Sequence, residues 1–143
     1  MPDATEATFR ALVDTIMPAH GGRPGAAELG VHVHVAEALD LLIPGFAAMA
    51  VILLDAYAAD VRPGAAFVDL TSTQRDEVVR ALAREPSQDL QELVGAILVF
   101  TVGAMFNERM GYDRASGRLD PPPTWAETGF GGPSPGHPRF RPS

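Results

Sequence analysis

The sequence predicts an all-α fold: a single-domain bundle of about five helices followed by an extended C-terminal arm. Apolar side chains recur at helical spacing along most of the first 110 residues, and no segment alternates convincingly with period two. Proline or glycine stands at the ends of most helical runs. Beyond residue 110 the periodicity stops, while glycine, proline and aromatic residues accumulate. We therefore assign residues 1–110 to the bundle and residues 111–143 to an arm of the same domain.

The first helix is expected to begin at Asp3, because Glu6 follows it in the spacing of a capping box. Pro18 ends this helix. Its apolar stripe consists of Phe9, Leu12, Val13 and Ile16. A glycine-rich loop and a short turn follow, and Gly30 is expected to end the turn.

Residues 31–43 and 46–60 are expected to form two further helices, separated by Pro44 and Gly45. The inward side chains of the first are expected to be Val31, Val35, Leu39 and Leu42. The second, FAAMAVILLDAYAAD, is apolar around much of its circumference, and Asp55 argues against a membrane span. Its expected inward face consists of Phe46, Met49, Ala50, Leu53 and Tyr57.

The fourth helix is preceded by a turn from which Phe67 and Leu70 are expected to enter the core. Thr71 and Gln74 have the spacing of a second capping box, which places the start of the helix there. Its predicted buried stripe consists of Val78, Val79, Leu82 and Ala83.

The fifth helix, expected from Ser87 to about Met110, contains the most apolar run of the chain, LVGAILVFTVGAMF at residues 93–106. A bilayer span needs about 20 such residues, and charged residues bracket this run too closely. We therefore expect the central helix of the bundle, or a helix shared with another chain. One of its faces is rich in small residues and permits close approach of a neighbouring segment: Gly95, Ala96, Val99 and Gly103.

The C-terminal arm is unusual in its aromatic residues, because disordered tails are typically poor in them. The arm holds Tyr112, Trp125, Phe130 and Phe140. We therefore expect it to lie on a surface, either of its own chain or of a partner.

The composition excludes several classes of function. The net charge is −7 and all eleven basic residues are arginines scattered along the chain, which argues against nucleic acid or an anionic membrane as the main partner. Without cysteine there is no disulfide, thiolate zinc site, iron–sulfur cluster or c-type haem attachment. No secretory signal is visible at the N-terminus, so a cytoplasmic location is expected, with export alongside a partner to the periplasm as the alternative.

No catalytic motif is found in the sequence. His32 and His34 are two residues apart, which on a helix is the wrong spacing for one metal ion, and Glu37 with Asp40 lacks the second pair of a di-iron site. No nucleophile elbow, P-loop or dinucleotide-binding glycine motif is present. We therefore expect no catalytic, cofactor or metal site here. A metal carrier is the less favoured alternative, and it would draw on His20, His32, His34, Asp14 and Glu28.

The order of segments resembles the gluconate 2-dehydrogenase subunit 3 family over nearly the whole chain. The resemblance is carried by five landmarks: Asp14-Thr-Ile-Met-Pro18, Pro24-Gly-Ala-Ala-Glu-Leu-Gly-Val-His32, Phe67 with Leu70 before a capped helix, the apolar helix near Gly111-Tyr112, and Thr124-Trp-Ala-Glu-Thr-Gly-Phe-Gly-Gly-Pro133. Family members commonly carry a twin-arginine export leader and a Gly-Gly-Asn after the tyrosine, and neither is seen here.

The resemblance implies a non-catalytic small subunit that binds and stabilises a large FAD-containing dehydrogenase of the glucose–methanol–choline type. FAD would belong to that partner, and a cytochrome c subunit commonly accepts the electrons. Contacts with the partner are expected from Tyr112, Trp125, Phe130, Phe140, Phe46 and Ile52. Two alternatives remain open: the arm folds back to complete a self-contained bundle, or the chain forms a homo-oligomeric helical scaffold.

Overall fold

The computed structural model describes residues 3–107, 112–113, 115–116, 118–119, 121 and 123–130. Within these residues the bundle consists of α1 (Asp3–Ile16), α2 (Val31–Leu42), α3 (Phe46–Val61), α4 (Ser72–Arg84) and α5 (Gln88–Met105), with a 3₁₀ turn η1 (Phe67–Asp69). The C-terminal segment adds a two-residue ladder, in which β1 (Tyr112–Asp113) pairs antiparallel with β2 (Arg118–Leu119), and a short helix, α6 (Pro123–Thr128). The predicted all-α, single-domain class is confirmed.

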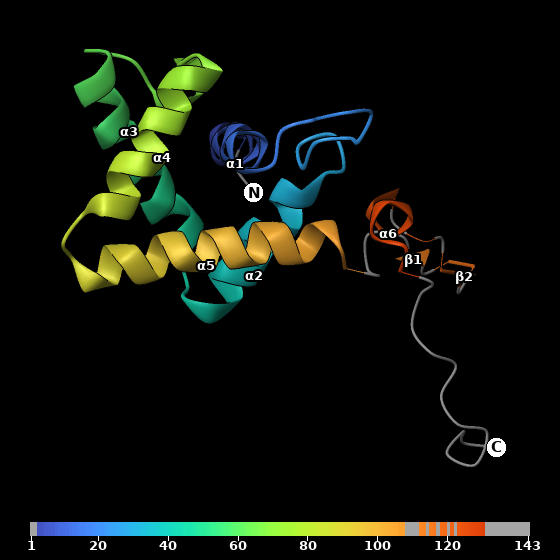
Figure 1. The fold of residues 1–143 in the computed structure, drawn as a ribbon. Coiled ribbons are helices and arrows are strands. Elements are labelled where there is room, and N and C mark those ends of the chain that lie inside the picture. The colour runs from blue at the N-terminus through green and yellow to red at the C-terminus, as the bar shows by residue number, and fades with distance from the viewer. Residues whose placement is uncertain are drawn as a thin grey trace.

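α5 runs along the bundle and crosses α2, while α3 and α4 lie together near its N-terminal end (Figure 1). α2 packs on both α1 and α5, and α4 packs on both α3 and α5. α6 lies at the opposite end, beyond the C-terminus of α5 (Figure 1). The arm expected to be extended therefore contains a helical turn and a short ladder.

The corner between α2 and α3 is fixed by a side chain of α2. Gly45 has a φ of 81°, a conformation that glycine adopts without strain. Asp40 Oδ1 accepts a hydrogen bond of 2.7 Å from the backbone N–H of Ala47, in the first turn of α3. The carboxylate thus satisfies one of the free N–H groups at a helix start. The two helices are bent by 113° at this corner.

Asp55, the one charged residue in the middle of the apolar α3, also has a structural partner. Its Oδ1 accepts a hydrogen bond of 2.8 Å from the backbone N–H of Phe67, whose ring is fully buried. The carboxylate therefore anchors η1 against α3. Of the helices described, none alone is long and apolar enough to cross a bilayer; α2 and α3 reach that length only as the bent pair.

The core is drawn from all five helices of the bundle and from η1. On α1 the predicted stripe is confirmed for Phe9, Leu12 and Val13, which are buried. On α4 it is confirmed for Val78 and Leu82, whereas Val79 is only partly buried and Ala83 is exposed. On α3 the prediction of the inward face was partly wrong. The buried residues are Phe46, Ala47, Ala50, Leu54 and Ala58. A helix that is apolar all round carries no periodic signal that could select one face. Met49 on α3 was predicted to face inward, but about half of its surface is exposed. The same holds for Leu42 on α2, which is 63% exposed.

α5 ends at Met105, five residues before the predicted end near Met110. Side chains of the C-terminal segment supply donors at this point. Thr124 Oγ1 donates to the carbonyl of Met105 at 2.6 Å, and Trp125 Nε1 donates to the carbonyl of Phe106 at 2.9 Å. Carbonyl groups at the end of a helix lack partners within the helix, and the arm provides them here.

Candidate partner interface

The outward face of α5 changes character halfway along the helix. In its first turns the exposed side chains are polar, as at Gln88, Gln91 and Glu92. Further on they are apolar, and Val99 is 70% exposed, with Leu98 and Val102 also exposed. A soluble helix normally keeps polar residues on its outward face. The C-terminal half of α5 therefore presents apolar surface that the described part of the chain does not cover.

α2 and α3 expose further apolar side chains near their shared corner. Leu41 is 86% exposed and Ile52 is 72% exposed. Around these two lie Leu42, Ile43 and Met49, each exposed by about half or more. Single exposed hydrophobic residues are ordinary, but a cluster of large ones marks an interaction surface.

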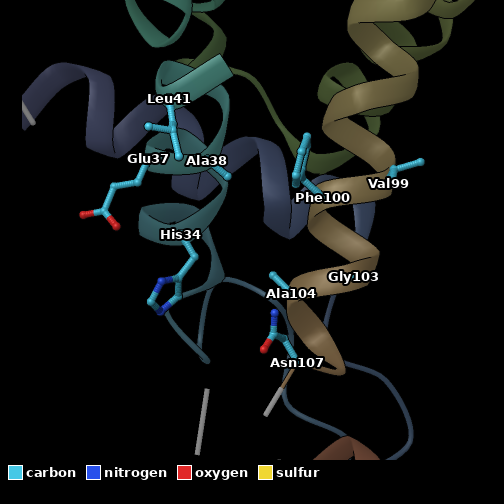
Figure 2. Close-up of a pocket in the computed structure, with 9 residues that line it drawn as sticks. All are labelled: His34, Glu37, Ala38, Leu41, Val99, Phe100, Gly103, Ala104 and Asn107. Carbon is cyan, nitrogen blue, oxygen red and sulfur yellow. The ribbon is translucent and has the colours of Figure 1, made fainter. Parts of the chain in front are cut away.

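A groove of about 560 Å³ lies between α2 and α5 (Figure 2). One wall comes from α2 and the other from the C-terminal half of α5. The side chain of Phe100 points from α5 toward α2, and His34 and Glu37 stand on the α2 side (Figure 2). The lining residues are His34, Glu37, Ala38, Leu41, Val99, Phe100, Gly103, Ala104 and Asn107.

A second groove, of about 550 Å³, lies on the other side of α2, against α1 and α3. Glu37 and Leu41 line both grooves. These two residues, one turn apart, therefore form a ridge on α2 that separates the hollows, and we call this feature the Glu37–Leu41 ridge.

Among the described residues, α2, α3 and α5 carry no lysine or arginine. Residues 24–61, which contain α2 and α3, hold neither lysine nor arginine, and the same is true of residues 85–107, which contain α5. Acidic side chains do line the grooves: Glu37 lines both, and Glu6 and Asp40 line the second. The arginines of the bundle lie on α1, on the loops and on α4. Charge is therefore segregated across the bundle.

The two glycines of α5 are not required by the packing of this chain. A methyl group built at Gly95 or Gly103 would meet no heavy atom within 4 Å. The small-residue face predicted to permit close approach is thus left open by the described part of the chain, and Gly103 lies in the first groove.

The predicted partner-contact residues fall into different environments. Ile52 is exposed on α3, and Phe130 is 52% exposed while its ring packs edge-on against Trp125 at 4.9 Å. Phe46 is 2% exposed and Trp125 is 5% exposed, so both are corrected to internal positions. Phe46 is the first residue of α3 and lies on the face of that helix that packs on the core. For Tyr112 only the backbone, in β1, is described, and Phe140 lies outside the described residues.

The histidines and carboxylates considered for a metal site are not brought together. Among the described residues no group of three or more metal-ligating side chains is close enough to hold an ion. Asp14 pairs instead with Arg75 at 3.7 Å, and His20 and Glu28 line a shallow hollow that also contains Arg23.

His32, considered from the sequence only as a metal ligand, is buried on α2. Its Nε2 lies 3.7 Å from Glu6 Oε1 on α1, and its buried Nδ1 has no hydrogen-bond partner among the described residues. Burial is the main cause that lowers the pKa of His32, and the charge of Arg10 acts in the same direction against the opposing effect of Glu6. The sequence signal for the burial of His32 was its position next to Val31, the first residue of the apolar stripe predicted for this helix.

Comparison with protein families identifies a match that covers most of the chain. The family model described as gluconate 2-dehydrogenase subunit 3 matches residues 3–132, which is nearly the whole chain. No curated protein and no solved structure matches the chain significantly.

Proposed function

The chain belongs to the gluconate 2-dehydrogenase subunit 3 family, and we propose that it is the non-catalytic small subunit that binds and stabilises a large FAD-dependent dehydrogenase. The family description identifies a subunit of a dehydrogenase complex. The partner would oxidise a sugar, polyol or other alcohol at its flavin and pass electrons to a separate acceptor such as a cytochrome c.

The observation that carries the proposal is the apolar surface on α2, α3 and α5 that the described residues leave exposed. Leu41, Ile52 and Val99 each keep more than two thirds of their surface exposed. Obligate complexes bury more than roughly 2,000 Å² of surface, with a strongly apolar interface. An uncovered face of this composition is what a subunit of such a complex needs.

The chemistry of the two grooves favours a cofactor held by the partner rather than by this chain. FAD carries a pyrophosphate, which proteins bind with helix N-termini, glycine-rich loops and basic side chains. Both grooves are lined mainly by acidic and apolar residues, with His34 and Asn107 in the first and Thr5 in the second, and neither lining contains lysine or arginine. Such a surface repels a pyrophosphate and suits an apolar protein surface.

Co-expression tests the proposal. The chain is produced alone and together with the flavoprotein dehydrogenase encoded beside it, and each preparation is analysed by size-exclusion chromatography with mass measurement. We expect a stable complex of both chains, and a dehydrogenase that loses solubility or FAD when produced alone. A dehydrogenase that is stable and fully active when produced alone and does not bind this chain would contradict the proposal.

A homo-oligomeric scaffold is the second candidate, because uncovered apolar surface also fits self-association. The same mass measurement on the isolated chain separates the two: a defined oligomer that does not dissociate on addition of the dehydrogenase favours the scaffold.

A further inference from the structure

The Glu37–Leu41 ridge and the outward face of α5 together form a surface with two properties at once, apolar and acidic. The first groove joins them, because Leu41 and Val99 line the same hollow from opposite helices. Leu41 is the most exposed large hydrophobic residue described. The first groove therefore connects the C-terminal part of α2 with the C-terminal half of α5.

This surface is not flat, and its grooves can accept protruding side chains of another protein. A ridge of α2 stands between two grooves of similar volume, about 560 and 550 Å³. Binding energy in protein interfaces is concentrated where large anchors enter such hollows. The open space over Gly103 deepens the first groove on its α5 side. An apolar anchor from a partner can enter there and meet Val99 and Phe100.

Charge decides between a second copy of this chain and a different protein. Glu37 is exposed on the ridge and Glu6 and Asp40 line the second groove, with no arginine or lysine in either lining. Two copies joined through this surface would place acidic groups against acidic groups, which costs free energy. A partner with arginine or lysine around apolar side chains would pair with them.

We infer that the Glu37–Leu41 ridge, with its two grooves and the outward face of Val99, is the docking surface for the dehydrogenase subunit. The complementary surface on that subunit presents apolar anchors flanked by arginine or lysine. This inference rests on the proposed function and specifies which face of the chain performs it. It also moves the main interface from the aromatic arm to α2 and α5.

The test uses exposed positions, so that the substitutions do not disturb the core. Leu41→Glu and Val99→Glu place charge in the apolar part of the surface, and Glu37→Arg reverses the charge of the ridge. The matched controls are Ala81→Glu and Glu77→Arg, at exposed positions on α4. Each variant is co-expressed with the tagged dehydrogenase, the co-purified amount is measured, and thermal unfolding of the isolated variant reports its folding.

We expect the three surface variants to retain folding but to reduce the co-purified amount by about tenfold or more, as for central interface positions. Both controls should co-purify like the wild type. Association of the wild type should be slower at high salt, and Glu37→Arg should weaken that salt dependence.

Three results overturn the inference in distinguishable ways. If the wild type binds the dehydrogenase and all three surface variants bind equally well, this surface is not the interface, while the proposed function stands. If the wild type forms no complex, the proposed function and the inference both fail. An isolated chain that dimerises, with the dimer abolished by Val99→Glu, would assign the surface to a second copy instead.

Discussion

Trp125 donates its indole N–H to the backbone carbonyl of Phe106 at a distance of 2.9 Å, across 19 residues of sequence. The bond joins α6 to the residue that follows the last turn of α5. Arg23, in the loop before α2, extends this attachment through an ion pair of 3.8 Å with Glu127. The C-terminal segment is thus held at the end of the bundle by groups that are far apart in the sequence.

Replacement of Trp125 by phenylalanine should destabilise the chain by about 1–2 kcal/mol, because it removes a buried donor and leaves the carbonyl of Phe106 unsatisfied. Urea unfolding of the isolated chain measures the change. Ile52→Ala serves as the control, since an exposed substitution is expected to stay within about 0.5 kcal/mol. Equal stability of Trp125→Phe and wild type would show that the indole bond contributes nothing.

Thr124 and Thr101 provide a matched pair of fully buried hydroxyl groups. Thr124 Oγ1 donates to Met105 at the open end of α5, whereas Thr101 Oγ1 donates to Ile97, one turn back in the same helix. Carbonyls within a helix already accept a backbone bond, but those at its end do not.

Thr124→Val is therefore expected to cost about 1–3 kcal/mol, and Thr101→Val much less. Denaturant midpoints with unchanged slopes test this difference. The explanation fails if the two valine variants are equally stable.

Alanine at Gly95 and Gly103 should stabilise the isolated chain by about 0.5–1 kcal/mol each, because alanine favours the helix and its methyl group has room. Gly30 is the control for backbone conformation. Its φ of 70° is unfavourable for alanine, so Gly30→Ala should destabilise by about 1–2 kcal/mol. Thermal melts of the three variants give the comparison, and a lower melting temperature for Gly103→Ala would contradict it.

Stability should fall as the pH drops below about 6.5, the ordinary pKa of histidine, because His32 has a lowered pKa in the folded chain. In that range the unfolded chain binds the proton more readily than the folded chain, so protonation favours unfolding. The contribution is fully present above the unfolded pKa and is lost as the pH falls toward the folded pKa.

Urea unfolding of His32→Gln between pH 8 and 5 should show a smaller loss than wild type. The exposed His34→Gln variant, altered on the same helix, should retain the wild-type loss. Parallel pH profiles for wild type and His32→Gln would rule out this origin of acid sensitivity.

The sequence was most informative where polar and apolar residues alternate clearly along a helix. α1 and α4 are amphipathic, with one polar and one apolar face, so Phe9 and Val78 could be placed in the core from spacing alone. The capping box at Thr71 and Gln74 is confirmed by reciprocal hydrogen bonds. The acidic residues Asp40 and Asp55 gave no such signal, because their partners are backbone N–H groups of later segments.

The interface was only partly predictable for the same reason. Of the residues predicted to contact a partner, Ile52 is exposed, whereas Phe46 and Trp125 are buried in this chain. The apolar character of α3 and α5 indicates that some surface must be covered, without indicating which. Val99 and Leu41 line one groove only because α5 crosses α2.

The sequence by itself determined that this chain is an all-α bundle, where most of its helices begin, and that it belongs to a family of dehydrogenase subunits. Those properties follow from local periodicity, capping residues and the order of motifs. Only the tertiary structure decided which side of α5 is covered, where α5 ends, and that Glu37 and Leu41 form a ridge between two grooves. These features depend on contacts between residues distant in sequence, and a helix that is apolar all round leaves that choice to its neighbours.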